Sequence, residues 1–285
     1  MLKCCFILFF GCFLPLNCHW VFKLPVASDM KEKVIKSSQE LSKILLEVGA
    51  MLMAAGANTS RIRTTITRIA NVYGFNAELL ITHRALMLSV YDDKLDYFQS
   101  SLKRTFPHGA NFKVVSGISR MSWKIVEEQW NYEQIWNEIN RLKSLSHYPR
   151  IVILLMVGLS GASFCRLFGG GAPDMLATFV ATFIGLIVRQ EAIKMNFNAY
   201  LCVFFASFTS VLIAGGYVHF TPGAQAEYAI ATSVLYLIPG VPLINSLSDL
   251  LDGNIMNGIM RGMNGLIIAF AIALGMLCSI LIYYI

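Results

Sequence analysis

The sequence predicts an α-helical polytopic membrane protein of about five transmembrane helices, preceded by a small α/β soluble domain. Composition is the first reason, because 56% hydrophobic and 14% charged residues, with a mean hydropathy of +0.59, are too apolar for an ordinary soluble domain. Charge is the second, because residues 1–148 hold 18 of the 23 Lys and Arg residues and 12 of the 17 Asp and Glu residues. A basic soluble module therefore precedes a membrane module, and no aromatic-basic pattern points to nucleic acid.

Residues 1–30 require a separate interpretation. Lys3 and the apolar run after it resemble the start of a signal peptide, but the stretch from Pro15 to Cys18 lacks the small residues of a cleavage site. This segment is a leader, an extra anchor, or upstream sequence absent from the working protein, with Met30 as the true start. The orientation derived below favours the last reading, since an exported leader would place the soluble module on the wrong side of the membrane.

Residues 31–148 read as a compact α/β domain. Apolar residues recur at helical spacing from Val34 to Leu52 and from Ile62 to Val72, which predicts a helical hairpin that turns at Gly56. Three short stretches rich in β-forming residues predict a small antiparallel sheet: Glu78–Thr82, Leu86–Tyr91 and Asn111–Ser116. A helical period then returns in Glu127–Leu145, which predicts the last helix of the domain.

The sequence offers no catalytic or metal-binding pattern. It contains no GxSxG, HExxH or Gly-rich phosphate loop, so His83 and His108 lack the partners of a catalytic site. The seven cysteines form no CxxC pair. We therefore predict no enzyme activity, no metal and no cofactor. Arg61, Arg63 and Arg68 read as a solvated helix face, with binding of an anionic regulator or the membrane surface as the alternative.

Residues 149–285 read as a five-span transmembrane module. Each of five apolar runs approaches the roughly 20 residues that a spanning helix needs. The runs are Arg150–Phe168, Asp174–Val188, Asn198–Gly216, Glu227–Leu251 and Gly258–Ile285. The loop after the second run carries Arg189 and Lys194, whereas residues 217–228 contain no Lys or Arg. The positive-inside rule then puts Arg150, Arg189 and the soluble domain in the cytoplasm, and the C-terminus outside.

Polar residues follow one face of the second span. Asp174, Thr178, Thr182, Gly185 and Arg189 recur at intervals of three and four residues, which forms a continuous stripe along a helix. This stripe faces protein or water rather than lipid. Interhelical hydrogen bonding is the simpler reading for the threonines, whereas an ionisable group inside a span often marks a substrate or proton pathway.

The fourth run is interrupted by prolines. Pro239 and Pro242, with Gly240 between them, predict that the helix stops near Ile238 and restarts near Leu243. Broken helices persist in a bilayer only where protein or water satisfies the freed backbone groups, and transporters build binding sites from such half-helices.

Polar side chains follow the break on one helical face. They are Asn245, Ser248, Asp249 and Asp252. In the fifth span Asn257, Arg261 and Asn264 share a face beside the sequence Gly258-x-x-x-Gly262, a close-packing pattern of membrane helices. Arg261 is the candidate ion-pair partner of the aspartates.

Three segments are distinctive as longer motifs: GANTSRI (Gly56–Ile62), YPRIVILLMVGLSGASFCRLFGGG (Tyr148–Gly171) and LIPGVPLINSLSDLLDGN (Leu237–Asn254). Together they resemble the threonine/serine exporter family, in particular its YjjP-like branch. The resemblance covers residues 34–285 and implies a cytoplasmic domain, a five-span module and export of succinate with a small YjjB-like membrane partner, since the chain ends at Ile285 without a second module. Relatives carry acidic residues near the positions of Asn58 and Arg63, which this chain lacks.

The resulting hypothesis is an efflux component of the bacterial inner membrane for small carboxylate metabolites, of the succinate or threonine/serine type, driven by the proton motive force. Arg189 or Arg166 would meet the solute carboxylate, and Asp249 with Asp252 would couple protons. The alternative is a membrane-anchored enzyme or sensor that acts through its α/β domain. Polar stripes inside the spans favour transport, because an anchor has no need of them.

Overall fold

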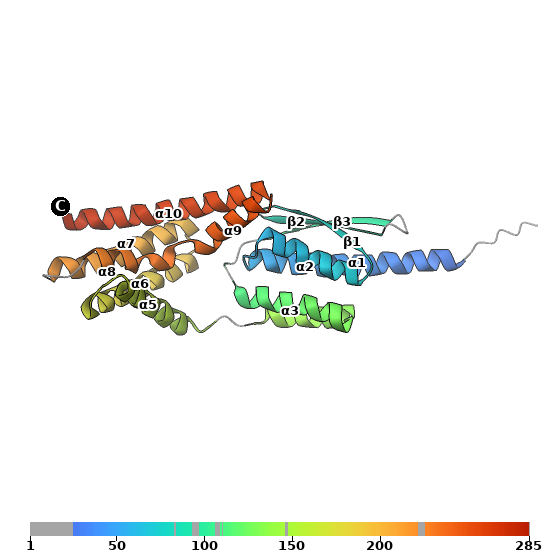
Figure 1. Cartoon of the computed structure of the whole chain (residues 1–285), viewed down its shortest axis with the longest axis horizontal. Coiled ribbons are helices and arrows are strands. Elements are labelled where there is room, and N and C mark those ends of the chain that lie inside the picture. The colour runs from blue at the N-terminus through green and yellow to red at the C-terminus, as the bar shows by residue number, and fades with distance from the viewer. Residues whose placement is uncertain are drawn as a thin grey trace, which may run out of the picture.

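The molecule is elongated, with an α/β part at one end and a bundle of long helices at the other (Figure 1). This computed structural model describes residues 25–82, 84–92, 97–105, 109, 111–145, 148–221 and 226–284. Residues 1–24, His83 and His108 lie outside the described residues, so the interpretations given for them remain predictions.

The α/β part contains four helices and a three-stranded antiparallel sheet of order β1-β2-β3 in the described residues. The helices are α1 (Pro25–Ala54), α2 (Thr59–Val72), α3 (Phe112–Glu128) and α4 (Tyr132–Lys143), and the strands are β1 (Asn76–Ile81), β2 (Ala85–Asp92) and β3 (Tyr97–Arg104). The register pairs Leu80 with Met87 and Met87 with Leu102. One face of the sheet packs on the helices, where Leu86, Leu88 and Val90 of β2 are fully buried beside Leu41, Ile44 and Leu45 of α1.

Two sequence predictions in this part are wrong. Asn111–Ser116 is not a strand, because Asn111 caps α3 by accepting a hydrogen bond from the amide of Val114 at 3.3 Å. The third strand is β3, which the sequence analysis missed. The predicted helix Glu127–Leu145 is divided, since α3 ends at Glu128 and α4 begins at Tyr132 behind a capping box of Asn131 and Gln134.

The turn between α1 and α2 is set by local backbone chemistry. Gly56 adopts a φ of 81°, and the amide of Ala57 donates to the carbonyl of Leu52 at 3.0 Å, which ends α1 in a Schellman-type turn. Asn58 then caps α2 by accepting from the amide of Arg61 at 3.0 Å. This turn leaves the carbonyl oxygens of Gly56 and Ala57 free to accept hydrogen bonds from another part of the chain.

The second half is helical throughout in the described residues. Its helices are α5 (Arg150–Leu167), α6 (Ala172–Lys194), α7 (Ala199–Phe220), α8 (Ala226–Ser233) followed by the 3₁₀ helix η1 (Leu235–Leu237), α9 (Gly240–Leu251) and α10 (Ile255–Tyr284). Four of them are long and apolar enough to cross a membrane, and the pair Glu227–Leu237 and Gly240–Leu251, bent by 63°, makes a fifth if it counts as one span. The predicted fold class is confirmed, with four or five spans in the described residues.

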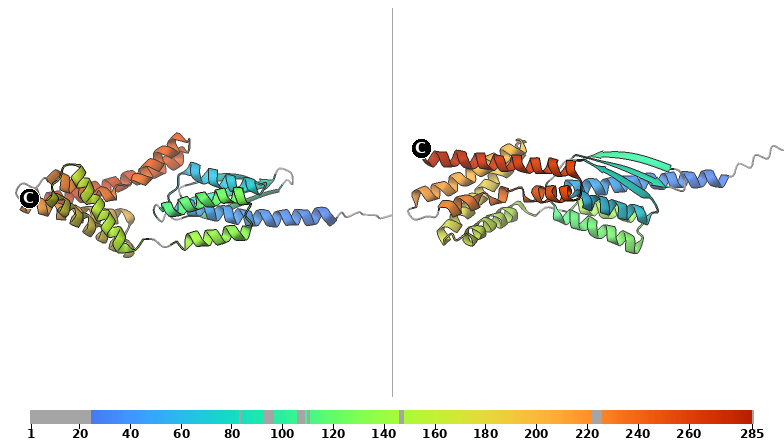
Figure 2. Two further views of the ribbon diagram at one scale, coloured as in Figure 1. Left: turned by 60° about the horizontal axis from the view of Figure 1, so that its bottom comes forward. Right: turned by 45° about the horizontal axis from the view of Figure 1, so that its top comes forward.

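The helix break is shorter than the sequence predicts. Helix α9 begins at Gly240 rather than near Leu243, because Pro239 and Pro242 fall at its N-cap and in its first turn, where no backbone amide is required. Gly253, with a φ of 79°, then reverses the chain into α10. The two views of Figure 2 show that α9 and the start of α10 reach the α/β part, whereas the C-terminus lies at the far end of the bundle.

Helices α9 and α10 pack closely through the predicted glycine pair. A Cβ atom on Gly258 would lie 3.0 Å from the carbonyl oxygen of Ser246, and one on Gly262 would lie 2.8 Å from the Ser246 hydroxyl. Ser246 in turn donates to the carbonyl of Gly258 at 2.7 Å. The close-packing prediction is therefore confirmed, and the hairpin forms a rigid platform for the polar side chains that it carries.

Candidate functional site

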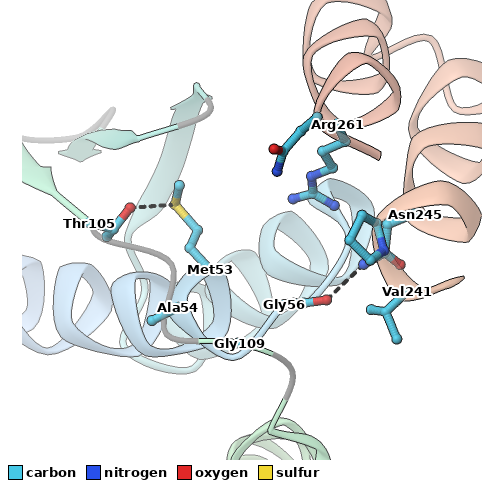
Figure 3. Close-up of a pocket in the computed structure, with 10 residues that line it drawn as sticks. Met53, Ala54, Gly56, Thr105, Gly109, Val241, Asn245 and Arg261 are labelled. Atoms are coloured by element: carbon cyan, nitrogen blue, oxygen red, sulfur yellow. Dashed lines mark hydrogen bonds between the residues drawn. The ribbon is translucent and has the colours of Figure 1, made fainter. Parts of the chain in front are cut away.

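The turn between α1 and α2 docks onto the hairpin of α9 and α10. Asn245 Nδ2 donates to the Gly56 carbonyl at 2.7 Å, and an Arg261 Nη2 donates to the Ala57 carbonyl at 3.1 Å. Figure 3 shows both side chains reaching from the hairpin toward this turn. The free carbonyls of the Schellman-type turn thus find their donors in residues nearly 200 positions later, which ties the α/β part to the broken helix.

Asp249 is the buried centre of this junction. Its side chain is fully buried, and Oδ1 accepts a hydrogen bond from the amide of Thr59 at 3.0 Å. Oδ2 lies 3.1 Å from an Arg261 Nη1, and the Arg261 side chain is 18% exposed. The carboxylate therefore sits at the N-terminus of α2 and beside a guanidinium, two positive partners that together offset the desolvation of a buried charge.

A second amide completes the junction. Asn257 Nδ2 donates to the Ile81 carbonyl at the end of β1 at 2.8 Å and lies 3.4 Å from Thr59 Oγ1. The hairpin therefore holds the first turn of α2 and the end of β1 at the same time.

A pocket of about 160 Å³ opens at this junction. Its walls come from α1, α9, α10 and the chain that follows β3, as Figure 3 shows. The lining residues are Met53, Ala54, Gly56, Thr105, Gly109, Val241, Pro242, Asn245, Arg261 and Asn264. Asn264 is oriented by the Tyr200 hydroxyl of α7, which donates to its Oδ1 at 2.8 Å. A guanidinium and two carboxamides thus share a pocket whose other walls are largely apolar.

The polar stripe of α6 faces the interior of the bundle, as predicted. Thr178 Oγ1 lies 3.4 Å from Thr232 Oγ1, and Thr182 Oγ1 donates to the Ser233 carbonyl at 3.3 Å. Both threonines are fully buried. Thr182 therefore satisfies one backbone carbonyl at the end of α8 before the break, which is the kind of contact that a broken membrane helix requires.

Each end of the stripe carries an ionisable residue. Asp174 caps α6 by accepting from the amide of Gly171 at 2.9 Å, and its other oxygen accepts from the Tyr217 hydroxyl at 3.0 Å. At the opposite end Arg189 Nε is buried without a hydrogen-bond partner among the described residues. The Arg189 charge lies within electrostatic range of Tyr236 and Cys202.

The structure separates the residues that the sequence analysis grouped together. It brings Asn245, Asp249 and Arg261 into one junction, whereas Asp252 caps the end of α9 with its side chain exposed. Ser248 is half-buried. Arg166 is exposed at the end of α5 away from the junction, where its Nη1 lies 3.3 Å from the Gly170 carbonyl. Neither Arg166 nor Arg189 lines the junction pocket, so its cation is Arg261.

Sequence reasoning missed several members of these networks. Thr59 was not singled out, although the GANTSRI segment containing it was, and no pattern linked that segment to Asp249. Tyr200, Tyr217 and Tyr236 were not singled out either, and only their hydroxyls could have marked them. In the part of the chain that the structure describes, no group of three His, Cys, Asp or Glu side chains could hold a metal ion.

Comparison with known proteins agrees with this architecture. A sequence model of the family described as "Putative threonine/serine exporter" matches residues 43–283. The chain is 26% identical over 247 residues to the "Probable succinate transporter subunit YjjP" of Klebsiella aerogenes, covering 86% of this chain and 95% of that protein. It is 25% identical over 250 residues to the protein of the same name in Escherichia coli K12, covering 87% and 96%. No solved structure matches.

Because the family match spans both the α/β part and the membrane helices, the chain belongs to the threonine/serine exporter family, a family of membrane transport proteins.

Proposed function

We propose that this chain is the large subunit of an efflux transporter for small carboxylate metabolites, dicarboxylates of the succinate type or threonine and serine, driven by the proton motive force. Its site would be the junction pocket. The observation that carries the proposal is the arrangement of Arg261, Asn245 and Asn264 around one pocket between the α/β part and the broken helix. A guanidinium and carboxamides are the groups that bind a carboxylate with defined geometry.

Arg261 has spare hydrogen-bonding capacity for a solute. A guanidinium carries five N–H donors. One of them is used on the Ala57 carbonyl, and Nη1 approaches Asp249 Oδ2 at 3.1 Å without a well-aligned hydrogen bond. A solute carboxylate that enters the pocket competes with Asp249 for this guanidinium. The two carboxylates would then share one cation and repel each other.

Proton coupling is assigned to the Asp249–Arg261 pair, because it contains a carboxylate that could take up a proton and a guanidinium that could bind a solute carboxylate. Asp249 also accepts the hydrogen bond from the Thr59 amide. A change in this ion pair would therefore act on the turn between α1 and α2.

We propose a polar route from the pocket into the bundle. Asn264 contacts Tyr200 of α7, and Arg189 of α6, whose Nε has no hydrogen-bond partner among the described residues, lies near Cys202 of the same helix α7. Beyond it the hydroxyls of Thr182 and Thr178 continue along the stripe. We assign Arg189 the next cation on the route, because an unpaired buried donor of this kind is costly unless it has a transient partner.

The proposed orientation places the α/β part in the cytoplasm of a bacterium and the chain in the inner membrane. Arg150 begins α5, Arg189 and Lys194 lie in the C-terminal part of α6, and the Arg150–Glu191 ion pair holds these two helix ends together, which supports one positively charged side. The relatives are named as subunits, which supports a separately encoded small membrane partner of the YjjB type. The solute would enter from the cytoplasm through the junction and leave at the far end of the bundle.

The test is solute release from cells that produce this chain, the small partner, or both, with intracellular and extracellular succinate, threonine and serine followed together. We expect release only when both proteins are present, and its collapse when the proton gradient is dissipated. Arg261→Lys keeps the charge but removes the planar fork, and should reduce release at least tenfold. Arg166→Lys, outside the pocket, is the matched control. Full release by the Arg261→Lys variant would overturn the assignment of the site.

A further inference from the structure

A second pocket, of about 320 Å³, lies in the α/β part between α2 and α3. Its lining is polar, and the residues that the argument uses are Asn58, Ser60, Arg61, Thr64, Arg68 and Ser119. This lining contains two arginines, a carboxamide and hydroxyl groups, and no carboxylate. It is therefore a concave surface of positive charge and hydrogen-bond donors that shares no lining residue with the junction pocket.

Two arginines face this pocket from a single helix. Arg61 and Arg68 are seven residues apart on α2, a spacing that brings side chains onto the same helical face. Neither forms an ion pair with a carboxylate of the described residues. Two arginines that line one cavity without a carboxylate partner among the described residues favour an anionic occupant, because a negative charge between them is attracted to both.

Arg68 is held in position before any ligand arrives. Its Nη1 donates to the Ser122 hydroxyl at 2.9 Å, and its guanidinium carbon lies 3.9 Å from the ring centroid of Trp123. Stacking on an aromatic face and a hydrogen bond from one nitrogen fix the plane of the guanidinium, while its remaining N–H groups stay available. This preorganisation reduces the entropy that a ligand would lose in ordering the side chain.

We infer that the pocket between α2 and α3 binds a phosphate group. A phosphate presents several acceptor oxygens around one centre and matches two guanidinium forks with adjacent hydroxyl donors. Two sources carry this chemistry: a soluble phosphorylated metabolite and the headgroup of an anionic phospholipid. The second is included because Ser60 directly follows Thr59, whose amide donates to Asp249 of α9, in the part of the chain with membrane-length helices. Occupancy of the pocket would thus act on the same first turn of α2 that docks on the broken helix.

The binding test uses the full chain in neutral detergent, titrated calorimetrically with inorganic phosphate at constant ionic strength. Arg61→Gln should weaken binding about tenfold, the loss expected for one charge-assisted hydrogen bond. Arg68→Lys, which preserves the charge near Trp123, should weaken it by a similar factor because the fork is lost. Arg63→Gln is the matched control, since Arg63 is an exposed arginine of the same helix outside the pocket. Absence of phosphate binding, or equal losses for Arg61→Gln and Arg63→Gln, would overturn the inference.

A second arm distinguishes the two sources. The chain is placed in nanodiscs of phosphatidylcholine alone or with phosphatidylglycerol, and the phosphate titration is repeated in each. If phosphatidylglycerol lowers the phosphate affinity of the native chain and of Arg63→Gln, but not that of Arg61→Gln, the lipid headgroup is the occupant. Equal phosphate affinity in both nanodiscs identifies a soluble phosphate compound. If phosphatidylglycerol still lowers the phosphate affinity of Arg61→Gln, the cause is repulsion of phosphate by the charged membrane surface. This result would contradict binding of a headgroup in the pocket.

Discussion

The amide nitrogen of Thr59 donates a hydrogen bond to Asp249 Oδ1 over 3.0 Å, joining two residues that are 190 positions apart in the chain. One belongs to the first turn of a helix in the α/β part, and the other to the half-helix that follows the proline break. Because Asp249 is also paired with Arg261, a single buried carboxylate connects the α/β part to both helices of the hairpin.

Removal of the Asp249 charge should destabilise the whole protein. Asp249→Asn leaves Arg261 as a buried cation without its counter-ion, at a cost of about 3–5 kcal/mol, and we expect little folded protein in the membrane. Asp252→Asn is the control, because Asp252 is exposed at the end of α9. The measurement is the amount of each variant in detergent-solubilised membranes together with its thermal unfolding midpoint. Equal midpoints for the two variants would show that the Asp249 ion pair contributes nothing to stability.

The double variant separates structure from transport. Asp249→Asn with Arg261→Gln removes both charges and replaces them with neutral groups that still form hydrogen bonds. We expect recovery of abundance to near the native amount without recovery of solute release, because the proposed coupling requires both ionisable groups. Abundance is measured in membranes and release in cells that also contain the partner. Restored release would show that the aspartate carries no transport chemistry.

Close packing of α6 and α7 should depend on the absence of a side chain at Gly185. A Cβ atom there would lie 1.9 Å from Ser210 Oγ, 2.5 Å from the Tyr236 hydroxyl and 3.1 Å from the Ala206 carbonyl. Gly185→Ala should therefore separate the two helices and lower stability by about 1–3 kcal/mol. Gly240→Ala is the matched control, since no atom lies within 4 Å of its added Cβ. Thermal unfolding of both variants in the same detergent provides the comparison, and an unchanged midpoint for Gly185→Ala would contradict this packing.

Glu47 should make the stability of the α/β part depend on acid pH. Its carboxylate on α1 pairs with Lys103 of β3 and Lys143 of α4. Burial raises its pKa, but the two ammonium groups outweigh burial and hold the pKa below the usual value of 4.5. Because the pKa of Glu47 is lower in the folded than in the unfolded protein, its ion pairs stabilise the fold above pH 4.5. This stabilisation is lost as the pH falls through the pKa of the folded protein.

The matching experiment compares Glu47→Gln with the native chain by hydrogen exchange of α1. We expect faster exchange in the variant at neutral pH, equivalent to about 1 kcal/mol, and a difference that vanishes in acid. Glu138→Gln is the control, because its partner Arg141 lies on the same helix and the pair joins no separate elements. A difference between Glu47→Gln and the native chain that stayed constant with pH would argue against the ion pairs as its cause.

Topology can be tested with reporters. A fusion after Lys194, at the end of α6, should behave as cytoplasmic, and one after Thr221, at the end of α7, as external, since only the former region carries the Lys and Arg bias. The readout is a reporter pair active on opposite sides of the membrane. The reverse pattern would place the α/β part outside the cytoplasm and would make residues 1–30 a true anchor.

Local patterns in the sequence determined the membrane class, the approximate spans, the break at Pro239 and Pro242, and the inward face of the α6 stripe. These features depend on apolar length, on helical periodicity and on a missing amide donor, all of which are properties of neighbouring residues. The sequence also marked Asn245 and Asp249 as unusual, because a polar group in a membrane segment requires a partner.

Only the tertiary structure decided which partners these groups have. Local propensity favoured a strand at residues 111–116, but an Asn111 cap and the burial of Val115 and Ile118 select helix α3. Asp252 follows Asp249 by three residues and shared its predicted face, yet it lies beyond the last turn of α9 and is exposed. Asp249 meets Thr59 and Arg261 because the hairpin docks on the turn between α1 and α2. Hydrogen bonds and ion pairs act over a few ångströms in space, so their partners are set by how distant segments pack rather than by their positions along the chain.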